Sequence, residues 1–236
     1  MWQPGKTNGE YTIEKMLGEG GFGITYLAKN KQNKQVVIKT INDQMQNHQL
    51  FDKFRRDFYN EALRLAKCTH PHIVNIIELI ETDGLPCIVM EYIPGENLHT
   101  CIDENHVSEA ESLLYIRQIG EALKCVHQVK LDDNQYLLHR DVKPLNIIIR
   151  NNKAHQKEAV LIDFGISRMF NPDEPETVNT IFESPGFTPI EQCYGKQGFY
   201  TDVYALAATL YYCLTKKYLK IVNLESICLR NNKMIP

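Results

Sequence analysis

No apolar run in the 236-residue sequence is long enough to cross a membrane. The most apolar stretch, Tyr204 to Leu214, is much shorter than the roughly 20 residues that a membrane-spanning helix needs. The chain opens without the charged and then apolar pattern of a secretory signal. A formal net charge of −3 gives no reason to expect nucleic acid or an anionic membrane as a partner. The sequence therefore predicts a cytoplasmic protein with no membrane-spanning segment and no nucleic-acid partner.

The sequence also lacks a C-x-x-C pair, and its seven cysteines are odd in number. Both features predict reduced thiols rather than a disulfide framework. His70 and His72, on either side of Pro71, suggest a metal site, but no second group of ligands follows nearby, so an ordinary structural role is favoured. With 43% hydrophobic and 23% charged residues, the composition is that of a globular chain with a sizeable core.

The first part of the chain is rich in strand-like segments. One helix is predicted within it, because apolar residues recur there every three or four positions: Phe51, Phe54, Phe58, Ala62 and Leu65. Runs of β-branched and aromatic residues between turn residues predict strands at Tyr11–Leu17, Ile24–Lys29, Gln35–Thr40, Ile73–Ile80 and Leu85–Met90.

The second part, after Pro94-Gly95, is richer in helix. Ser108 and Glu111 form a capping-box pattern ahead of a helix that is expected to end near Val129. Because ligands favour the cleft between two such parts, the junction near Glu91 to Gly95 is a candidate binding site. The remaining predictions are strands at Leu137–Arg150 and Ala159–Ile162, a polar segment at Asn171–Gln197 and an apolar helix from Asp202.

The run Gly18-Glu19-Gly20-Gly21-Phe22-Gly23 fits the pattern G-x-G-x-x-G. In a dinucleotide-binding fold this loop would open a helix, but β-branched and aromatic residues follow it here, in Ile24-Thr25-Tyr26. The loop is therefore expected to join two strands, with a bare backbone that can lie close over phosphate groups. A glycine-rich hairpin turn without a ligand is the alternative.

Lys39 follows the apolar run Val36-Val37-Ile38 at the end of a predicted strand. A cation there can reach the phosphates of a nucleotide under the glycine loop, although most lysines at strand ends are only solvated. Glu61 lies on the flank of the apolar face of the predicted helix, where a carboxylate can turn inward and pair with Lys39. An ordinary solvent-facing glutamate is the alternative.

Two polar segments follow in order, His139-Arg140-Asp141-Val142-Lys143-Pro144-Leu145-Asn146 and, after a predicted strand, Asp163-Phe164-Gly165. Phosphoryl transfer needs metal ions that bridge the phosphates, a cation on the phosphates and a carboxylate that orients the attacking hydroxyl. The two segments together supply two carboxylates and an amide. Because both occur in this order, incidental polar loops are a much weaker interpretation.

With these motifs the sequence resembles the eukaryotic-type protein kinases over about Glu10 to Lys217. Lys143 and the run Ser184-Pro185-Gly186-Phe187 are similar to the serine/threonine kinases, and the Gly-Gly-Phe-Gly loop to their bacterial members. The resemblance implies an α+β fold of two lobes, an N-lobe with an antiparallel sheet and one long helix at residues 10–91 and a mostly helical C-lobe at residues 92–236. It also implies ATP and Mg²⁺ (or Mn²⁺) as cofactors, with serine and threonine hydroxyls of proteins as acceptors.

The resemblance assigns roles to individual residues. Asp141 would be the catalytic base, and Lys143 would contact the γ-phosphate. Lys39, held in place by Glu61, would bind the other phosphates. The remaining ligand-binding residues would be Gly18, Glu19, Gly20, Gly21, Phe22 and Gly23 over the nucleotide, Met90, Glu91 and Ile93 around adenine, and Asn146 and Asp163 on the metal.

Further residues would support this site. Asp202 would anchor the catalytic loop through its backbone, and Pro189-Ile190-Glu191 resembles the end of a kinase activation segment. Phosphate on Thr177 or Thr180 would pair with Arg140, although ordinary loop threonines are the alternative. Ser184 and Thr188 would be structural or substrate-contacting residues. A stack between the lobes would consist of Leu65, Ile76, His139 and Phe164.

The sequence departs from the family at its C-terminus. Family members continue with three further helices after the one near Asp202, whereas the residues from Leu219 on match no kinase element. Those helices normally shield the apolar helix and pair the carboxylate that is equivalent to Glu191. We therefore expect a truncated C-lobe, which a partner covers, or a kinase-fold regulatory or binding module with little activity.

Overall fold

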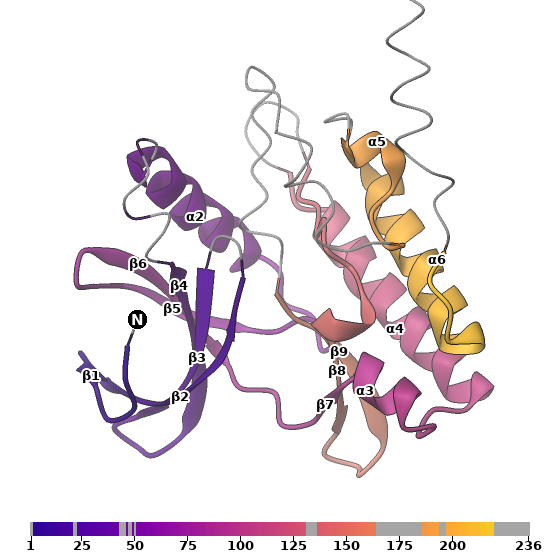
Figure 1. Ribbon diagram of the computed structural model, residues 1–236, viewed down its shortest axis with the longest axis horizontal. Helices are drawn as coiled ribbons and strands as arrows, with labels where there is room; N and C mark the ends of the chain where they lie inside the picture. The colour runs from indigo at the N-terminus through magenta and orange to yellow at the C-terminus, as the bar shows by residue number, and fades with distance from the viewer. Residues whose placement is uncertain are drawn as a thin grey trace, which may run out of the picture.

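The computed structural model describes residues 2–20, 23–42, 46, 49, 51–130, 136–163, 186–193 and 197–219; at Asn8, Asp57, Glu61 and Cys193 it describes the backbone only. A sheet-rich part and a helix-rich part lie side by side (Figure 1). This is the α+β architecture that the sequence predicts. No helix among the described residues has the length and apolar character needed to cross a membrane.

The sheet-rich part is a six-stranded antiparallel sheet with helix α2 packed against β5 and β6 (Figure 1). Helix α2 spans Phe51–Leu65, and its residues Phe58, Ala62 and Leu65 are buried, as the apolar periodicity predicts. The strand order is β1-β2-β3-β4-β6-β5. The strands are β1 (Thr7–Asn8), β2 (Tyr11–Glu19), β3 (Gly23–Asn30), β4 (Gln35–Ile41), β5 (Ile76–Thr82) and β6 (Leu85–Glu91).

The side chains of β3 and β4 lie alternately on the two faces of the sheet, because successive residues of a strand point to opposite faces. Tyr26 and Ile38 are paired across the strands and pack into an apolar cluster on one face. Thr25 and Lys39, also paired across the strands, line a pocket on the other. The same alternation therefore builds a core and places a buried cation at a binding site.

Residues ahead of β2 cover the apolar face of this sheet. The Trp2 side chain is only 9% exposed, its ring lies 5.2 Å from that of Tyr26, and its Nε1–H donates to Asp83 at 3.2 Å. Lys6 forms an ion pair with the same carboxylate. The N-terminal segment thus ties β3 to the β5–β6 turn.

Replacing the single tryptophan should destabilise the sheet-rich part. We expect Trp2→Ala to lower the free energy of unfolding by about 3 kcal/mol, because it removes a large buried ring and leaves a cavity. Trp2→Phe should cost about 1 kcal/mol, since the ring packing remains and only the hydrogen bond to Asp83 is lost. Chemical unfolding followed by circular dichroism measures both. Equal stability of Trp2→Ala and the native protein would contradict the packing role.

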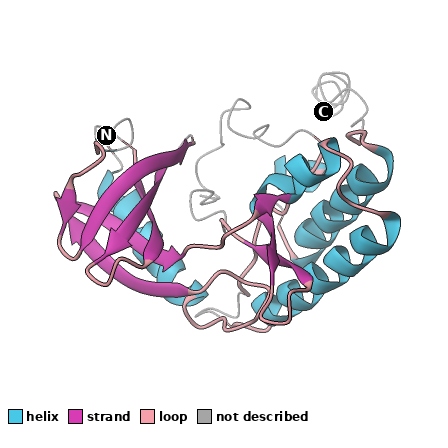
Figure 2. Ribbon diagram, turned by 90° about the horizontal axis from the view of Figure 1, so that it is seen from below, coloured by secondary structure: helices cyan, strands magenta, loops and turns pink. Residues whose placement is uncertain are grey.

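The helix-rich part, whose helices are cyan on the right of Figure 2, is built on α4 and α6 and a small sheet. The two helices run in opposite directions (Figure 1). Ser108 caps α4 in the predicted capping box with Glu111. Apolar residues of these helices, among them Tyr115, Ile119, Ala208 and Tyr212, form one core with the small sheet. The elements are β7 (Glu96–Asn97), α3 (Leu98–Asp103), α4 (Glu109–His127), the short 3-10 turn η2 (Pro144–Asn146), β8 (Ile147–Asn151), β9 (Lys157–Leu161), α5 (Ile190–Cys193) and α6 (Phe199–Thr215).

The link between α2 and β5 joins the two parts. The Leu161 N–H of β9 donates to His72 O at 2.9 Å, and the Val74 N–H donates to Leu161 O at 3.0 Å. His72 Nδ1 lies 2.8 Å from Ala159 O. This histidine therefore has the structural role that the sequence favoured, and residues 72–74 extend the small sheet by one short segment.

Several predicted boundaries were wrong. Of the short strands predicted within Leu137–Arg150, only one is present, at Ile147–Asn151, because side-chain hydrogen bonds hold the preceding residues in an irregular loop. The last helix begins at Phe199 rather than Asp202, because the Gly198 N–H donates to the Thr201 hydroxyl and starts the helix earlier. Strand β7 and helix α3 were missed, since a two-residue strand and a six-residue helix give almost no periodic signal.

Candidate active site

A pocket of about 410 Å³ lies between the two parts, within the size range of ligand sites. The sheet-rich part contributes the start of the glycine loop, β3 and β4, and the segment from Glu91 to Gly95, here called the hinge, closes one side. Lys39 and Asp163 lie at its polar end. Its lining is Leu17, Gly18, Thr25, Val37, Lys39, Val74, Met90, Glu91, Tyr92, Ile93, Gly95, Asn97, Ile148, Ile162 and Asp163.

The glycine loop joins β2 and β3, so a dinucleotide-binding fingerprint, which needs a helix here, is ruled out. The Gly20 N–H donates to Gly23 O at 2.9 Å, and the Asn42 amide holds Gly20 O at 3.0 Å. A Cβ atom on Gly23 would lie 2.8 Å from Thr40 O, which explains the glycine. Gly21 and Phe22 lie outside the described residues.

Lys39 is buried, with 8% of its surface exposed, and pairs with the Asp163 carboxylate. A buried ammonium needs a partner of this kind, because leaving it unpaired away from water is costly. Glu61 lies on α2, as predicted, but its side chain is outside the described residues. The Lys39–Glu61 pair therefore stays a prediction.

Asp141 lies at the centre of a compact polar group. Lys143 Nζ is 2.9 Å from Asp141 Oδ2. The Asn146 amide nitrogen donates to Asp141 O at 2.8 Å and to Asp141 Oδ2 at 2.9 Å. The turn η2 begins at Pro144 and brings Asn146 back towards Asp141. The three residues that the sequence predicted in one segment are thus in direct contact.

His139 links this group to the segment that carries Asp163. Burial lowers the pKa of the His139 ring, which therefore stays neutral. The Asp141 N–H donates to His139 Nδ1 at 3.2 Å, so the single ring proton belongs on Nε2, which lies 3.2 Å from Ile162 O. The Ile162 N–H in turn donates to Asn146 O at 2.9 Å. These bonds fix Asp163 beside Asn146.

Asp202 of α6 anchors the loop that carries His139, Arg140 and Asp141. Its fully buried carboxylate accepts the His139 N–H at 2.8 Å, the Arg140 N–H at 2.7 Å and a bond from His127 Nε2 at 2.8 Å. Burial alone would raise the pKa of Asp202, but the His127 bond, the nearby His139 ring and the backbone N–H donors bring that pKa below its ordinary value. The anchored Arg140 backbone has a φ of 68°, which is uncommon for a residue other than glycine.

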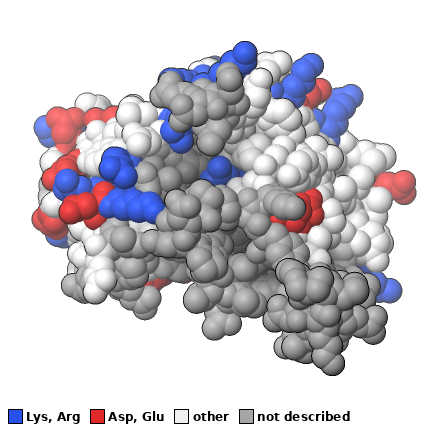
Figure 3. All heavy atoms as spheres, turned by 90° about the horizontal axis from the view of Figure 1, so that it is seen from above, with Lys and Arg blue, Asp and Glu red and all other residues white. Residues whose placement is uncertain are grey.

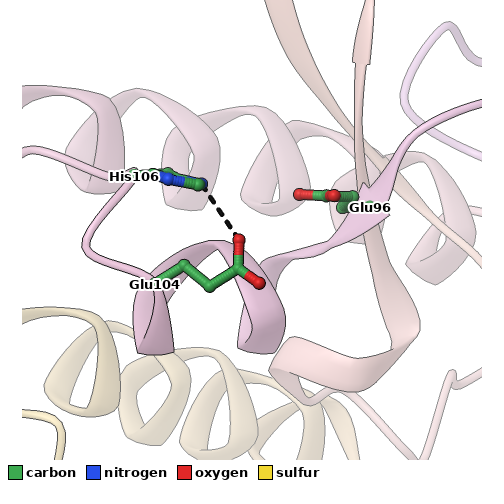
Figure 4. A group of neighbouring side chains, drawn as sticks. All are labelled: Glu96, Glu104 and His106. Carbon is green, nitrogen blue, oxygen red and sulfur yellow. Dashed lines mark ion pairs between the residues drawn. The ribbon is translucent and has the colours of Figure 1, made fainter.

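The oxygen donors of Asn146 and Asp163 fit a hard divalent cation. Because the Asn146 amide nitrogen points to Asp141, its oxygen is directed away from this pair and is available as a ligand. Glu96, Glu104 and His106 form a second group of potential ligands, at the surface (Figure 4). His106 Nδ1 lies 3.2 Å from a Glu104 oxygen, so an ion pair accounts for this group, and none of the three lines the pocket.

A family model described as the protein kinase domain matches residues 11–229 of the sequence. The chain belongs to the protein kinase family. Serine/threonine-protein kinase B of Synechocystis is 30% identical over 94% of this chain and 39% of its own length. A probable serine/threonine-protein kinase of Clostridium perfringens is 30% identical over 87% of this chain and 28% of its own length. These relatives confirm the resemblance to bacterial serine/threonine kinases.

Solved structures agree with the fold. The kinase domain of PknI from Mycobacterium tuberculosis superposes with a TM-score of 0.70 at 26% identity, over 92% of this chain and 79% of that chain. The two-lobed kinase fold that the sequence predicts is therefore confirmed. The chain spans only about a quarter to two fifths of the length of these and similar curated relatives.

Met90 and the hinge contribute buried apolar side chains to the pocket. Met90 and Ile93 are each 6% exposed, and the pairing of Met90 with Val37 places two apolar side chains at the pocket. The Glu91 N–H donates to Asn75 O at 2.9 Å, which fixes the start of the hinge.

Much of the activation segment of the kinase lies outside the described residues, including Phe164, Thr177, Thr180 and Ser184. The predictions for these residues are not tested by the structure. The segment is described again from Gly186, and Thr188 is buried. Burial raises the pKa of Tyr204 on α6, and the Glu191 carboxylate raises this pKa further.

Sequence reasoning missed three residues that hold the site together. His127 contacts Asp202, Asn42 holds the glycine loop, and the Gln192 amide donates to Arg140 O at 3.3 Å. Each is one polar residue whose partner lies between 22 and 75 positions away in the sequence. No local pattern marks such a contact, so only the fold could reveal it.

Proposed function

We propose that this kinase domain, residues 10–236, transfers the γ-phosphoryl group of ATP to serine and threonine hydroxyls of proteins. The observation that carries the proposal joins two groups of residues: Lys39 and Asp163 pair at the edge of the pocket, and Asn146, which contacts Asp141, accepts a hydrogen bond from the Ile162 N–H next to Asp163. Lys143 contacts Asp141 in the second group. Phosphoryl transfer depends almost entirely on positioning and charge stabilisation, which is what this set of groups supplies.

ATP would lie with its adenine against Met90 and Val37 and with hydrogen bonds to the Glu91 and Ile93 backbone. The glycine loop, Gly18-Glu19-Gly20-Gly21-Phe22-Gly23, would cover the phosphates. Lys39, oriented by Glu61, would bind the α- and β-phosphates in addition to its contact with Asp163. The division at Glu91 into an N-lobe and a C-lobe follows from this pose.

Asn146 and Asp163 would hold Mg²⁺, or Mn²⁺, which neutralises charge on the phosphates when bound. Asp141 would orient the substrate hydroxyl and accept its proton as the oxygen attacks phosphorus. Lys143, already 2.9 Å from Asp141, would contact the γ-phosphate and so bring the acceptor and the phosphate together. The proton ends on Asp141, and the bond between the β,γ-bridging oxygen and phosphorus breaks, which leaves ADP.

A protein partner on the outer face of α6 belongs to the same proposal. Val203, Ala207, Tyr211 and Leu214 recur at helical spacing and are exposed there. The helix-rich part also shows a broad uncharged area in the surface view (Figure 3).

A binding module without activity is not favoured, because the described catalytic side chains are in contact. Use of ATP and the free cysteines among the described residues favour a cytoplasmic location.

The test is transfer of labelled phosphate from Mg-ATP to a generic protein acceptor by the purified protein. We expect label on serine and threonine after acid hydrolysis of the acceptor. Absence of transfer to any of several acceptors, with nucleotide binding intact, would leave a nucleotide-binding module rather than an enzyme.

Removal of divalent metal should abolish this transfer. The reason is that the oxygen donors of Asn146 and Asp163 suit Mg²⁺ or Mn²⁺, and the phosphate charge needs such an ion. We expect excess chelator to reduce transfer to background and added Mg²⁺ or Mn²⁺ to restore it. Undiminished transfer in chelator would count against the metal assignment of both residues.

A further inference from the structure

Arg150 contacts three separate segments of the kinase domain. Its Nε donates to Glu158 Oε1 at 2.8 Å, its Nη1 lies 3.4 Å from Glu91 Oε1, and its Nη2 lies 3.4 Å from Pro71 O. The arginine is on β8, and its side chain is 21% exposed. None of the sequence motifs includes it.

Each of the three partners belongs to a different structural unit. Glu158 is directly opposite Arg150 on β9, within the helix-rich part. Glu91 ends β6 and begins the hinge of the sheet-rich part. Pro71 belongs to the link between α2 and β5, whose following residues pair with Leu161. The guanidinium therefore lies where the hinge, the link and the small sheet meet.

The three contacts of Arg150 differ in length, and the shortest of them fixes the position of the guanidinium. The shortest bond goes to Glu158, whose side chain is 13% exposed, so this carboxylate fixes the guanidinium to the small sheet. The other nitrogens then extend towards Glu91 and Pro71. A planar group with five N–H donors can serve three acceptors in this way, whereas a lysine ammonium at the end of a flexible chain cannot hold the same directions.

We propose that Arg150 is a positioning residue that holds the hinge at the distance from the small sheet that nucleotide binding needs. It acts through the side chain of Glu91, a residue that also lines the pocket. Ile148 on β8 and Met90 beside Glu91 both line that pocket, so a change in the spacing between β8 and the hinge changes its shape. The inference rests on the proposed function, because it assumes a nucleotide at the hinge.

The experiment compares nucleotide affinity among four variants, by titration with a fluorescent ATP analogue. Arg150→Ala and Glu91→Ala should each weaken binding about 3- to 10-fold, the range expected for a residue that acts on a site through neighbours. For Arg150→Ala the Michaelis constant for ATP should rise by the same factor, while the turnover number at saturating ATP stays within about twofold. The double variant should bind no more weakly than Arg150→Ala, because both changes break one contact. Arg150→Lys should fall between Arg150→Ala and the native protein.

A purely electrostatic effect on nucleotide binding predicts different affinities for these variants. Loss of a positive charge weakens and loss of a negative charge strengthens the attraction for an anionic nucleotide, so weaker binding by Glu91→Ala cannot be a charge effect. Lys153→Ala is the matched control. Lys153 lines a surface hollow together with Arg150 and Glu91, and its loss removes the same positive charge as the loss of Arg150. Its affinity should be unchanged.

Several results would overturn the proposal. Native affinity in a folded Arg150→Ala protein, or additive losses in the double variant, would separate Arg150 from the hinge. Should Arg150→Ala fail to fold, Glu91→Ala decides alone, because its side chain is 38% exposed and its removal spares the core. Native binding by Glu91→Ala would then reject the proposal. A native protein that binds no nucleotide would instead refute the proposed function.

Discussion

Asp141→Asn should lower the rate of phosphoryl transfer by about 10²–10⁴, the usual contribution of a positioned acid or base. The amide is nearly the same size as the carboxylate and can still accept bonds from Asn146 and Lys143, which lie 2.9 Å from Asp141 Oδ2. The loop should therefore keep its shape, while the proton acceptor is lost. Nucleotide affinity should stay close to that of the native protein, since Asp141 does not line the pocket.

The measurement combines initial rates of transfer with nucleotide titration on the same preparation. Glu121→Gln, the same chemical change at an exposed position of α4, is the matched control and should be fully active. Equal turnover by Asp141→Asn and native protein would remove Asp141 from the mechanism. A parallel loss of nucleotide affinity would indicate a structural rather than a catalytic effect.

Asp202→Asn should affect both stability and activity. In the native protein, two carboxylate oxygens accept three hydrogen bonds in a fully buried position. An amide offers one acceptor and one NH₂ group, which would face an N–H donor. We expect the free energy of unfolding to fall by about 3 kcal/mol, the scale for an unpaired polar group in a buried network. Activity should fall by about 10² or more, because the displaced loop carries Asp141.

The effect of Asp202→Asn on stability should depend on pH in a defined direction. The pKa of Asp202 is lower in the folded protein than its ordinary value near 3.9, so the unfolded chain binds this proton more readily. The stability due to the ionised carboxylate is therefore complete at neutral pH and is lost as the pH falls below about 4. The difference in unfolding free energy between native and variant proteins should narrow over the same range.

Urea unfolding at pH 7 and at lower pH measures this difference, with Glu121→Gln again as the control. A variant as stable and as active as the native protein would show that Asp202 does not anchor the loop. A stability gap that widens as the pH falls would contradict the assigned direction of its pKa.

Local patterns in the sequence were sufficient for much of the fold. Apolar periodicity predicted that α2 exists and which of its residues are apolar, and the capping box of Ser108 and Glu111 placed the start of α4. Such patterns succeed because the burial of one helix face and the bonds of one helix end depend on residues a few positions apart. Boundaries failed around Leu137 to Asn146, where bonds from distant residues replace the regular backbone pairing.

The candidate site likewise contains residues that the sequence could predict and residues that only the tertiary structure reveals. The sequence by itself predicted the candidate catalytic residues, because Asp141, Lys143 and Asn146 lie within one short loop, where their spacing is visible. Tertiary structure alone decided what supports them. His127 and Asp202 are 75 positions apart and Arg150 and Pro71 are 79 apart, so each contact exists only because α4, α6, β8 and the α2–β5 link pack together. Contacts of this kind leave no periodic or local pattern, since the chain between the partners can have any sequence that folds.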